Sequence, residues 1–205
     1  MQPLKISEIF YSLQGEGYRQ GKPSIFIRTQ GCSAQNACFK SGIICDTEFE
    51  SGKEYDPEQI LKNISKKIPC KEIVWSGGEP TDQLTEDVID LFKKAGYYQC
   101  IETSGIRQPH EGIDYIALSP KVAEHTILKR WKPRADGTLC DELRWVRHVD
   151  QELPKTKIKA HHYFLSPHFD GEQINYQNLG WCMNQCLQNP KWRISVQQHK
   201  LWRIR

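Results

Sequence analysis

The sequence lacks the features that mark secreted, membrane-bound or nucleic-acid-binding chains. Residues 1–10 have no apolar stretch of the kind found in signal peptides, and no apolar run is long enough to cross a membrane. The formal net charge is only +3, and Lys and Arg form no basic tail. We therefore expect a cytoplasmic protein with no nucleic-acid and no membrane partner.

Linkers, internal repeats and low-complexity tracts are also missing. A chain of 205 residues can bury a full hydrophobic core without covalent cross-links, so we expect a single domain over residues 1–205. Its eight cysteines would stay reduced in the cytoplasm. Metal binding or burial then explains them better than disulfides do.

Short β-branched runs alternate with segments of helical period. The runs predict strands at residues 24–28, 72–75, 98–102, 115–118, 143–147, 163–165 and 193–196. Apolar residues at helical spacing predict helices that begin near residues 56–58, begin near Leu84, and span residues 174–187. Residues 122–141 show no clear period and are expected to form a loop. The alternation predicts an α/β fold with a parallel sheet.

Residues 31–47, GCSAQNACFKSGIICDT, carry Cys32, Cys38 and Cys45 on one loop. Three thiolates can hold an iron–sulfur cluster, which normally takes four ligands, and one iron then stays open for a substrate or cofactor. Neither interval is the two-residue gap of familiar metal knuckles. Taken alone, the same residues could be core thiols or part of a zinc site that a distant residue completes.

The segment Ser76-Gly77-Gly78-Glu79-Pro80 follows the strand predicted to end at Trp75. Parallel strands present their carboxyl ends to ligands, and glycines there let the backbone approach a ligand closely. A Gly-Gly pair is more often an ordinary turn. Its position after a strand, like that of the cysteine loop, favours a functional site.

The cysteine loop and the Gly-Gly-Glu-Pro segment resemble the radical S-adenosylmethionine (SAM) superfamily. Further segments resemble the 7-carboxy-7-deazaguanine synthase family: EIFYSLQGEG at 8–17, Arg28, CDT at 45–47, ETSG at 102–105, SPK at 119–121 and QQHK at 197–200. The resemblance implies a partial, open (β/α) barrel of the radical SAM type. It also implies a carbon–nitrogen lyase that converts 6-carboxy-5,6,7,8-tetrahydropterin to 7-carboxy-7-deazaguanine with loss of ammonia, on the route to queuosine and other 7-deazapurines.

The resemblance assigns roles by position, and no side chain beyond the cofactor-derived radical is expected to be catalytic. A [4Fe–4S] cluster would be held by Cys32, Cys38 and Cys45, and SAM by Gly78, Ser119, Pro120, Lys121, Ser166, Pro167 and His168. The pterin substrate would be bound by Leu13, Gln14, Gly15, Glu16, Arg28, Ser76 and His199, and Mg²⁺ by Thr47. The Glu16 carboxylate suits the donor-rich amide and amino edge of the pterin, and Arg28 suits its carboxylate. A flavodoxin-type electron donor and a homodimer are also implied.

The chain departs from the family pattern at two places. The usual second cysteine of the loop would fall at Gly42, so Cys38 must replace it if the loop still supplies three thiolates. Cys70, Cys100 or a non-cysteine ligand near Gly42 are the alternatives. The segment Ser166-Pro167-His168 stands where relatives often carry Gln-Pro-Met.

Two other functions fit part of the sequence. A radical SAM activase that installs a glycyl radical on a partner protein would share the cysteine loop but would not need Gln14, Gly15, Glu16 or Arg28. A zinc-stabilised binding module would need only the cysteines, and colourless rather than brown protein would identify it. Taken singly, Thr47 is more often a helix cap, Arg28 a surface ion pair and His199 a solvated strand-end residue.

Overall fold

The computed structural model describes residues 1–40, 45 and 48–205, apart from the side chain of Lys40. The strands are β1 (Leu4–Leu13), β2 (Pro23–Thr29), β3 (Lys53–Tyr55), β4 (Glu72–Gly77), β5 (Tyr98–Thr103), β6 (Tyr115–Leu118), β7 (Cys140–Arg147), β8 (Ala160–Pro167) and β9 (Trp192–Ile194). The helices are α1 (Gln35–Lys40), α2 (Pro57–Lys67), α3 (Glu86–Lys94), α4 (Glu124–Arg130), α5 (Tyr176–Gln188) and α6 (Gln198–Trp202), with a 3₁₀ turn at Pro80–Asp82.

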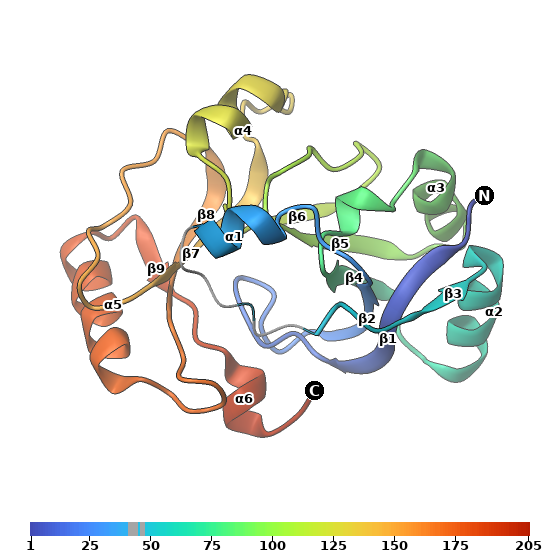
Figure 1. Ribbon diagram of the computed structural model, residues 1–205, viewed down its shortest axis with the longest axis horizontal. Helices are drawn as coiled ribbons and strands as arrows, with labels where there is room; N and C mark the ends of the chain where they lie inside the picture. Colours follow the sequence, from blue (N-terminus) through green and yellow to red (C-terminus); the bar gives the residue numbers. More distant parts are fainter. Residues whose placement is uncertain (41–44, 46–47) are drawn as a thin grey trace.

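The nine strands in the described part of the chain form one sheet in the order β3-β1-β2-β4-β5-β6-β7-β8-β9. Neighbours from β2 to β9 are parallel, whereas β1 pairs antiparallel with both β2 and β3. Figure 1 shows α2 and α3 beside one end of the curved sheet and α5 beside the other. The two end strands do not pair, so the sheet is an open barrel, and the predicted fold class is confirmed.

One face of the sheet packs against the helices through hydrocarbon side chains. Ile27, Trp75 and Leu118 on the strands share a buried cluster with Ile60 of α2 and Phe92 of α3. Each of these helices places its apolar side chains on the side that faces the sheet. In α2, for example, Asp56 caps the first turn by accepting a hydrogen bond from Glu58 N at 2.9 Å, and Ile60 and Ile64 fall on the buried side.

The opposite face lines the inside of the barrel in two layers. Strand register places Phe26 beside Val74, Val74 beside Cys100, and Cys100 beside Tyr115, and these form a small apolar cluster. Side chains two positions further along each strand point the same way and form the next layer. That layer is mostly polar and contains Glu8, Arg28, Ser76, Glu102, Ala117, Glu142 and His162. The polar layer therefore lies nearer to the carboxyl ends of the parallel strands.

The prediction of a loop over residues 122–141 was wrong. This segment contains α4 and the beginning of β7 at Cys140. Helix α4 is too short to show a clear period; its Ile127 is fully buried and packs at Gly105. Cys140 is paired with Ala160, a contact between segments that sequence periodicity does not reveal.

Other predicted elements exist with ends that differ by up to three residues. Strands β1 and β3 and helices α1 and α6 were not predicted. In β1 only Leu4 and Ile6 are fully buried, so its sequence gives a weak strand pattern. No helix in the described part of the chain combines the length and apolar character needed to span a membrane.

Candidate active site

The cysteine loop leaves β2 at the carboxyl edge of the barrel. Gly31 adopts φ +83°, which favours glycine, and Cys32 follows it, three residues before α1 begins at Gln35. Cys38 lies within α1, where its backbone N donates to Ala34 O at 3.0 Å. Ser33 anchors the loop, because its N and Oγ donate to the two carboxylate oxygens of Asp82 at 2.8 and 2.7 Å. The loop is therefore tied to the segment that follows β4.

The three thiols of this loop influence one another electrostatically. Burial raises the pKa of Cys32 to about 11, and negative charge at Glu79, Cys38 and Cys45 adds to the rise. Burial also raises the pKa of Cys38, while nearby Lys121 opposes it. Such thiols resist ionisation by themselves and become thiolates readily when a cationic metal centre is bound.

The donor set fits an iron–sulfur cluster in its chemistry. Three soft sulfur atoms from one loop, with Lys121 beside them, match the ligands that such clusters take. Over residues 1–40, 45 and 48–205, no three His, Cys, Asp or Glu side chains are already gathered closely enough to hold a metal ion. The predicted Mg²⁺ ligand Thr47, like Gly42, lies outside the described residues.

The glycines after β4 are required by close packing on this loop. Gly77 has φ +108°, and a Cβ added there would lie 2.4 Å from Thr29 N. A Cβ on Gly78 would lie 1.7 Å from Gly31 O and 3.2 Å from the Cβ of Cys32. Gly78 thus lies against the first cysteine, and this close backbone contact is itself a reason for glycine; its role in binding SAM stays a prediction.

Glu79 fixes the same junction from inside. Its side chain is fully buried and accepts hydrogen bonds from Thr81, Thr103 and Ser104, the last through both N and Oγ. Its own backbone N donates to Gly31 O at 3.0 Å. A buried carboxylate is stable only with several donors. Glu79 therefore joins β5, the cysteine loop and the turn after β4 rather than facing a ligand.

The other predicted SAM residues lie at the ends of β6 and β8. Ser119 N donates to Thr103 O and Lys121 N to Ser104 O, both at 2.9 Å, so this turn is held beside the end of β5. Ser166 is buried, and its Oγ has no hydrogen-bond partner among the described residues. A buried hydroxyl of this kind fits a polar ligand. His168 stacks on His148 with ring centres 4.2 Å apart.

Three predicted substrate residues are linked through Glu102, which the sequence reasoning left without a role. Ser76 Oγ donates to one Glu102 oxygen at 3.2 Å, and Gln14 Nε2 donates to the other at 3.1 Å. The Gln14 carbonyl oxygen accepts from Glu16 N at 3.1 Å. Glu102 is thus held at the inner face of β5 with 30% of its side chain exposed.

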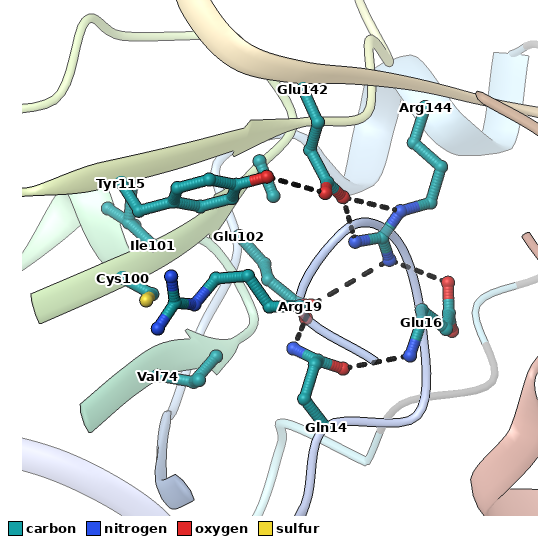
Figure 2. A pocket seen from close by; sticks show the side chains of 11 residues that line it. Gln14, Glu16, Arg19, Val74, Cys100, Ile101, Glu102, Tyr115, Glu142 and Arg144 are labelled. Atoms are coloured by element: carbon teal, nitrogen blue, oxygen red, sulfur yellow. Dashed lines mark hydrogen bonds and ion pairs between the residues drawn. The ribbon is translucent and has the colours of Figure 1, made fainter. Parts of the chain in front are cut away.

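Arg144 continues this network toward the centre of the barrel, as Figure 2 shows. Its Nη1 lies 2.6 Å from Glu16 Oε2 and 3.7 Å from Glu102 Oε1. Its Nε and Nη2 both donate to Glu142 Oε1, the former at 3.0 Å. The other Glu142 oxygen accepts from Tyr18 N and the Tyr115 hydroxyl, each at 2.9 Å. One guanidinium therefore serves three carboxylates.

Burial alone would raise the pKa of Glu16, but Arg144, Gln197 and His199 together hold it below its ordinary value. Gln197 Nε2 donates to Glu16 Oε1 at 3.0 Å. His199 lies close to Gly15, since a Cβ added to Gly15 would lie 2.2 Å from its Nδ1. His199 belongs to α6, so it is not the solvated strand-end residue that its position in the sequence alone would suggest. Segments at opposite ends of the chain thus form one side of the site.

Arg28 and Leu13 lie at the margin of this group. Arg28 Nε lies 3.4 Å from Glu8 Oε1, and its guanidinium stands over the Phe10 ring. Arg205 pairs with the other Glu8 oxygen at 3.3 Å. Leu13 ends β1 and is partly exposed. Arg28 therefore belongs to the polar layer by register, with Glu8 as its present partner.

Glu102, Glu142 and Arg144 were missed as site residues. A signal for them existed in the period-two alternation of their strands, where each charged side chain follows or precedes a buried apolar one. Glu142 was missed because the strand was predicted to begin one residue later, at Leu143, whereas β7 begins at Cys140. Buried charges on the inner face of a parallel sheet are a recognisable mark of a site.

The open α/β barrel, with three thiols on the loop after its first parallel strand, defines the radical SAM class. No family model matches the chain. The 7-carboxy-7-deazaguanine synthase of Haemophilus influenzae is 38% identical over 207 residues, which cover 97% of this chain and 92% of that protein. The synthase of Bacteroides thetaiotaomicron is 35% identical over 201 residues, or 98% of each chain. The chain belongs to the 7-carboxy-7-deazaguanine synthase family.

The fold has a counterpart among solved structures. The crystal structure of QueE from Escherichia coli matches with a TM-score of 0.68 and 23% sequence identity, covering 96% of this chain and 95% of that one. The likeness spans the whole of the open barrel. It therefore confirms the architecture that the strand order describes.

Proposed function

We propose that this protein is a radical SAM lyase that converts 6-carboxy-5,6,7,8-tetrahydropterin to 7-carboxy-7-deazaguanine with loss of ammonia, in the biosynthesis of queuosine and related 7-deazapurines. Family membership over nearly the full chain supports this reaction. The observation that carries it furthest is the group of Gln14, Glu16, Ser76 and Glu102 beside the cysteine loop. An activase acting on a protein would not need such a small, partly buried, hydrogen-bonded group.

Cys32, Cys38 and Cys45 would hold a [4Fe–4S] cluster, and Gly78, Ser119, Pro120, Lys121, Ser166, Pro167 and His168 would line SAM. When bound, the cluster and SAM would supply the radical chemistry that removes a hydrogen atom from the substrate. The chain's contribution is to orient the substrate and to exclude water. The buried Ser166 hydroxyl and the backbone at Gly78 are suited to close contact with a polar cofactor.

The polar layer is suited to the two ends of the substrate. Glu16 and Glu102 present acceptors to the amino and amide N–H groups of the pterin, and the pKa of Glu16 is lowered, so its carboxylate stays ionised at neutral pH. Leu13, Gly15 and His199 would close this side. Arg28 would pair with the carboxylate of the substrate, in place of or beside Glu8.

Mg²⁺ bound through Thr47, a flavodoxin-type electron donor, a homodimeric assembly, a cytoplasmic location and a single domain complete the proposal. A carboxylate oxygen, a threonine hydroxyl and water are the ligands that Mg²⁺ prefers. The lack of a basic tail and of a membrane-length apolar run agrees with a small-molecule enzyme.

Anaerobic turnover tests the function directly. Cluster-loaded protein with SAM, a reductant and the tetrahydropterin should yield the absorbance of 7-carboxy-7-deazaguanine together with ammonia. Glu16→Gln keeps the size of the side chain but loses its charge, so product should fall while reductive SAM cleavage without substrate persists. Wild-type protein that cleaves SAM but leaves the pterin unchanged would exclude the proposed reaction.

A further inference from the structure

We infer that Arg144 is a positioning residue that holds Glu16 and Glu102 in place for the substrate, with Glu142 as its fixed anchor. The inference rests on the proposed function, and it adds two residues that the sequence motifs did not include. Arg144 extends from β7 into the barrel, while Glu16 and Glu102 come from the β1–β2 loop and from β5. The guanidinium is the group that joins all three parts of the site.

Exposure rises in steps from the anchor to the two acceptors. The side chain of Glu142 is 1% exposed, that of Arg144 10%, that of Glu16 16% and that of Glu102 30%. Both oxygens of Glu142 already accept hydrogen bonds, from Arg144 on one side and from Tyr18 N and Tyr115 on the other. The oxygens of Glu16 and Glu102 accept hydrogen bonds too, so it is exposure that separates the three carboxylates. Glu142 is too enclosed to contact a substrate, whereas Glu16 and Glu102 remain partly exposed.

Arg144 has more carboxylate partners than a structural ion pair requires. Glu142 alone would neutralise Arg144, yet the guanidinium also reaches Glu16 at 2.6 Å and Glu102 at 3.7 Å. Three carboxylates and one guanidinium leave two negative charges uncompensated within the group. Such a pocket favours a ligand edge that offers only N–H donors. A planar guanidinium fork fixes the direction of each carboxylate as well as its charge.

Arg19 offers a matched control in the same barrel. It comes from the same β1–β2 loop as Glu16, pairs with Glu72 through two nitrogens, and lies over the rings of Tyr98 and Tyr115 at 4.7 and 5.2 Å. Its side chain is 15% exposed, close to the value for Arg144. Arg19 lines the same pocket as Glu16 and Arg144, but it forms its hydrogen bonds and ion pair with Glu72 and none with a proposed substrate residue. Loss of a buried arginine can thus be separated from loss of substrate positioning.

The test is equilibrium dialysis of 6-carboxypterin, the oxidised analogue of the substrate, against cluster-loaded enzyme with SAM between pH 5.5 and 7.5. Because Arg144→Met leaves Glu142 unpaired, the double variant Arg144→Met/Glu142→Gln is measured beside it, as is Arg144→Lys. Without the guanidinium, burial raises the pKa of Glu16 and only Gln197 and His199 oppose it, so this pKa should increase. Affinity should then fall at least tenfold at pH 7 and fall further as the pH decreases, whereas wild-type affinity should stay nearly level.

Arg144→Lys should restore part of the affinity, since one ammonium cannot bridge three carboxylates. Two histidines lie near these carboxylates, His199 near Glu16 and His162 near Glu142, and both are present in every variant. Arg19→Met should therefore show the wild-type affinity and pH profile, even if its melting temperature falls. In turnover assays the Arg144 variants should raise KM for the pterin much more than they lower SAM cleavage without substrate.

The outcomes separate the two proposals. If wild-type enzyme turns over the tetrahydropterin and the double variant binds 6-carboxypterin with the wild-type profile, Arg144 has no positioning role. An equal loss in Arg19→Met would also overturn the inference, because the effect would then follow from burial alone. Wild-type protein that neither binds 6-carboxypterin nor converts the tetrahydropterin would overturn both the function and the role of Arg144.

Discussion

The two faces of the sheet are built from the same strands but differ in polarity and in burial. On the helix-covered face, alternate residues such as Ile27, Trp75 and Ile101 are fully buried hydrocarbon or aromatic groups. On the inner face, their neighbours Arg28, Ser76 and Glu102 are polar and partly exposed. The first face stabilises the fold by excluding water, and the second arranges charges around a ligand.

The difference shows how a period of two can separate stability from function. Adjacent residues on one strand point to opposite faces, so a substitution at one position can change the core while its neighbour changes the site. The inner face also has its own apolar layer, formed by Phe26, Val74, Cys100 and Tyr115, which lies directly below the polar layer. We expect variants of the two faces to affect different measurements.

The largest expected effect lies at the rim where both faces end, in the cysteine loop. Cys38→Ala should lose most of the cluster iron and all SAM cleavage, because two local thiolates cannot replace three. Iron analysis and 5′-deoxyadenosine release measure both. Cys70→Ala is the matched control, since Cys70 lies before β4 at the opposite edge and its Sγ contacts Pro23 O at 3.2 Å. Full iron and activity in Cys38→Ala would show that another group is the second ligand.

On the helix-covered face, Phe92→Ala should lower the free energy of unfolding by about 3–5 kcal/mol. Phe92 is fully buried, and its ring meets those of Trp75 and Tyr97 edge-on. Denaturant unfolding of the apoprotein gives the magnitude. At a temperature where the variant stays folded, affinity for 6-carboxypterin should match that of wild type; a large loss of affinity would contradict the separation of the two faces.

On the inner face, Arg28→Ala should reduce kcat/KM for the pterin by an amount equivalent to about 2–5 kcal/mol, because a charge-assisted pair is lost in a closed site. SAM cleavage without substrate should change little. Arg134→Ala is a suitable control, since Arg134 is 29% exposed and paired with Asp141, while Arg28 is 28% exposed and paired with Glu8. Unchanged pterin kinetics in Arg28→Ala would remove Arg28 from the substrate site.

The smallest effect is expected for the metal ion. Exhaustive chelation should slow turnover and added Mg²⁺ should restore it, while Thr47→Ala should need about tenfold more Mg²⁺ for the same rate. Iron content, measured before and after chelation, shows whether the cluster has survived. Turnover that is indifferent to chelation with an intact cluster would exclude Mg²⁺ from the mechanism.

The sequence by itself determined the fold class, and it indicated the cysteine loop and the segment after Trp75 as a candidate site. Apolar alternation and helical spacing predicted the parallel strands from β2 onward and helices α2, α3 and α5, because burial imposes these periods on each segment. Local patterns placed the cysteine loop and Gly78 directly after predicted strands. These features depend on neighbours in the chain, so they can be read from it directly.

Only the tertiary structure decided which side chains meet. Strand register brings Arg28 beside Ser76 and Glu142 beside Ala117, and no local pattern fixes register between segments far apart in sequence. The approach of Gln197 and His199 to Glu16, and of Arg144 to three carboxylates, depends on closure of the curved sheet. A buried charge keeps its ionised form through its partners in space, so its role was hidden until those partners were placed.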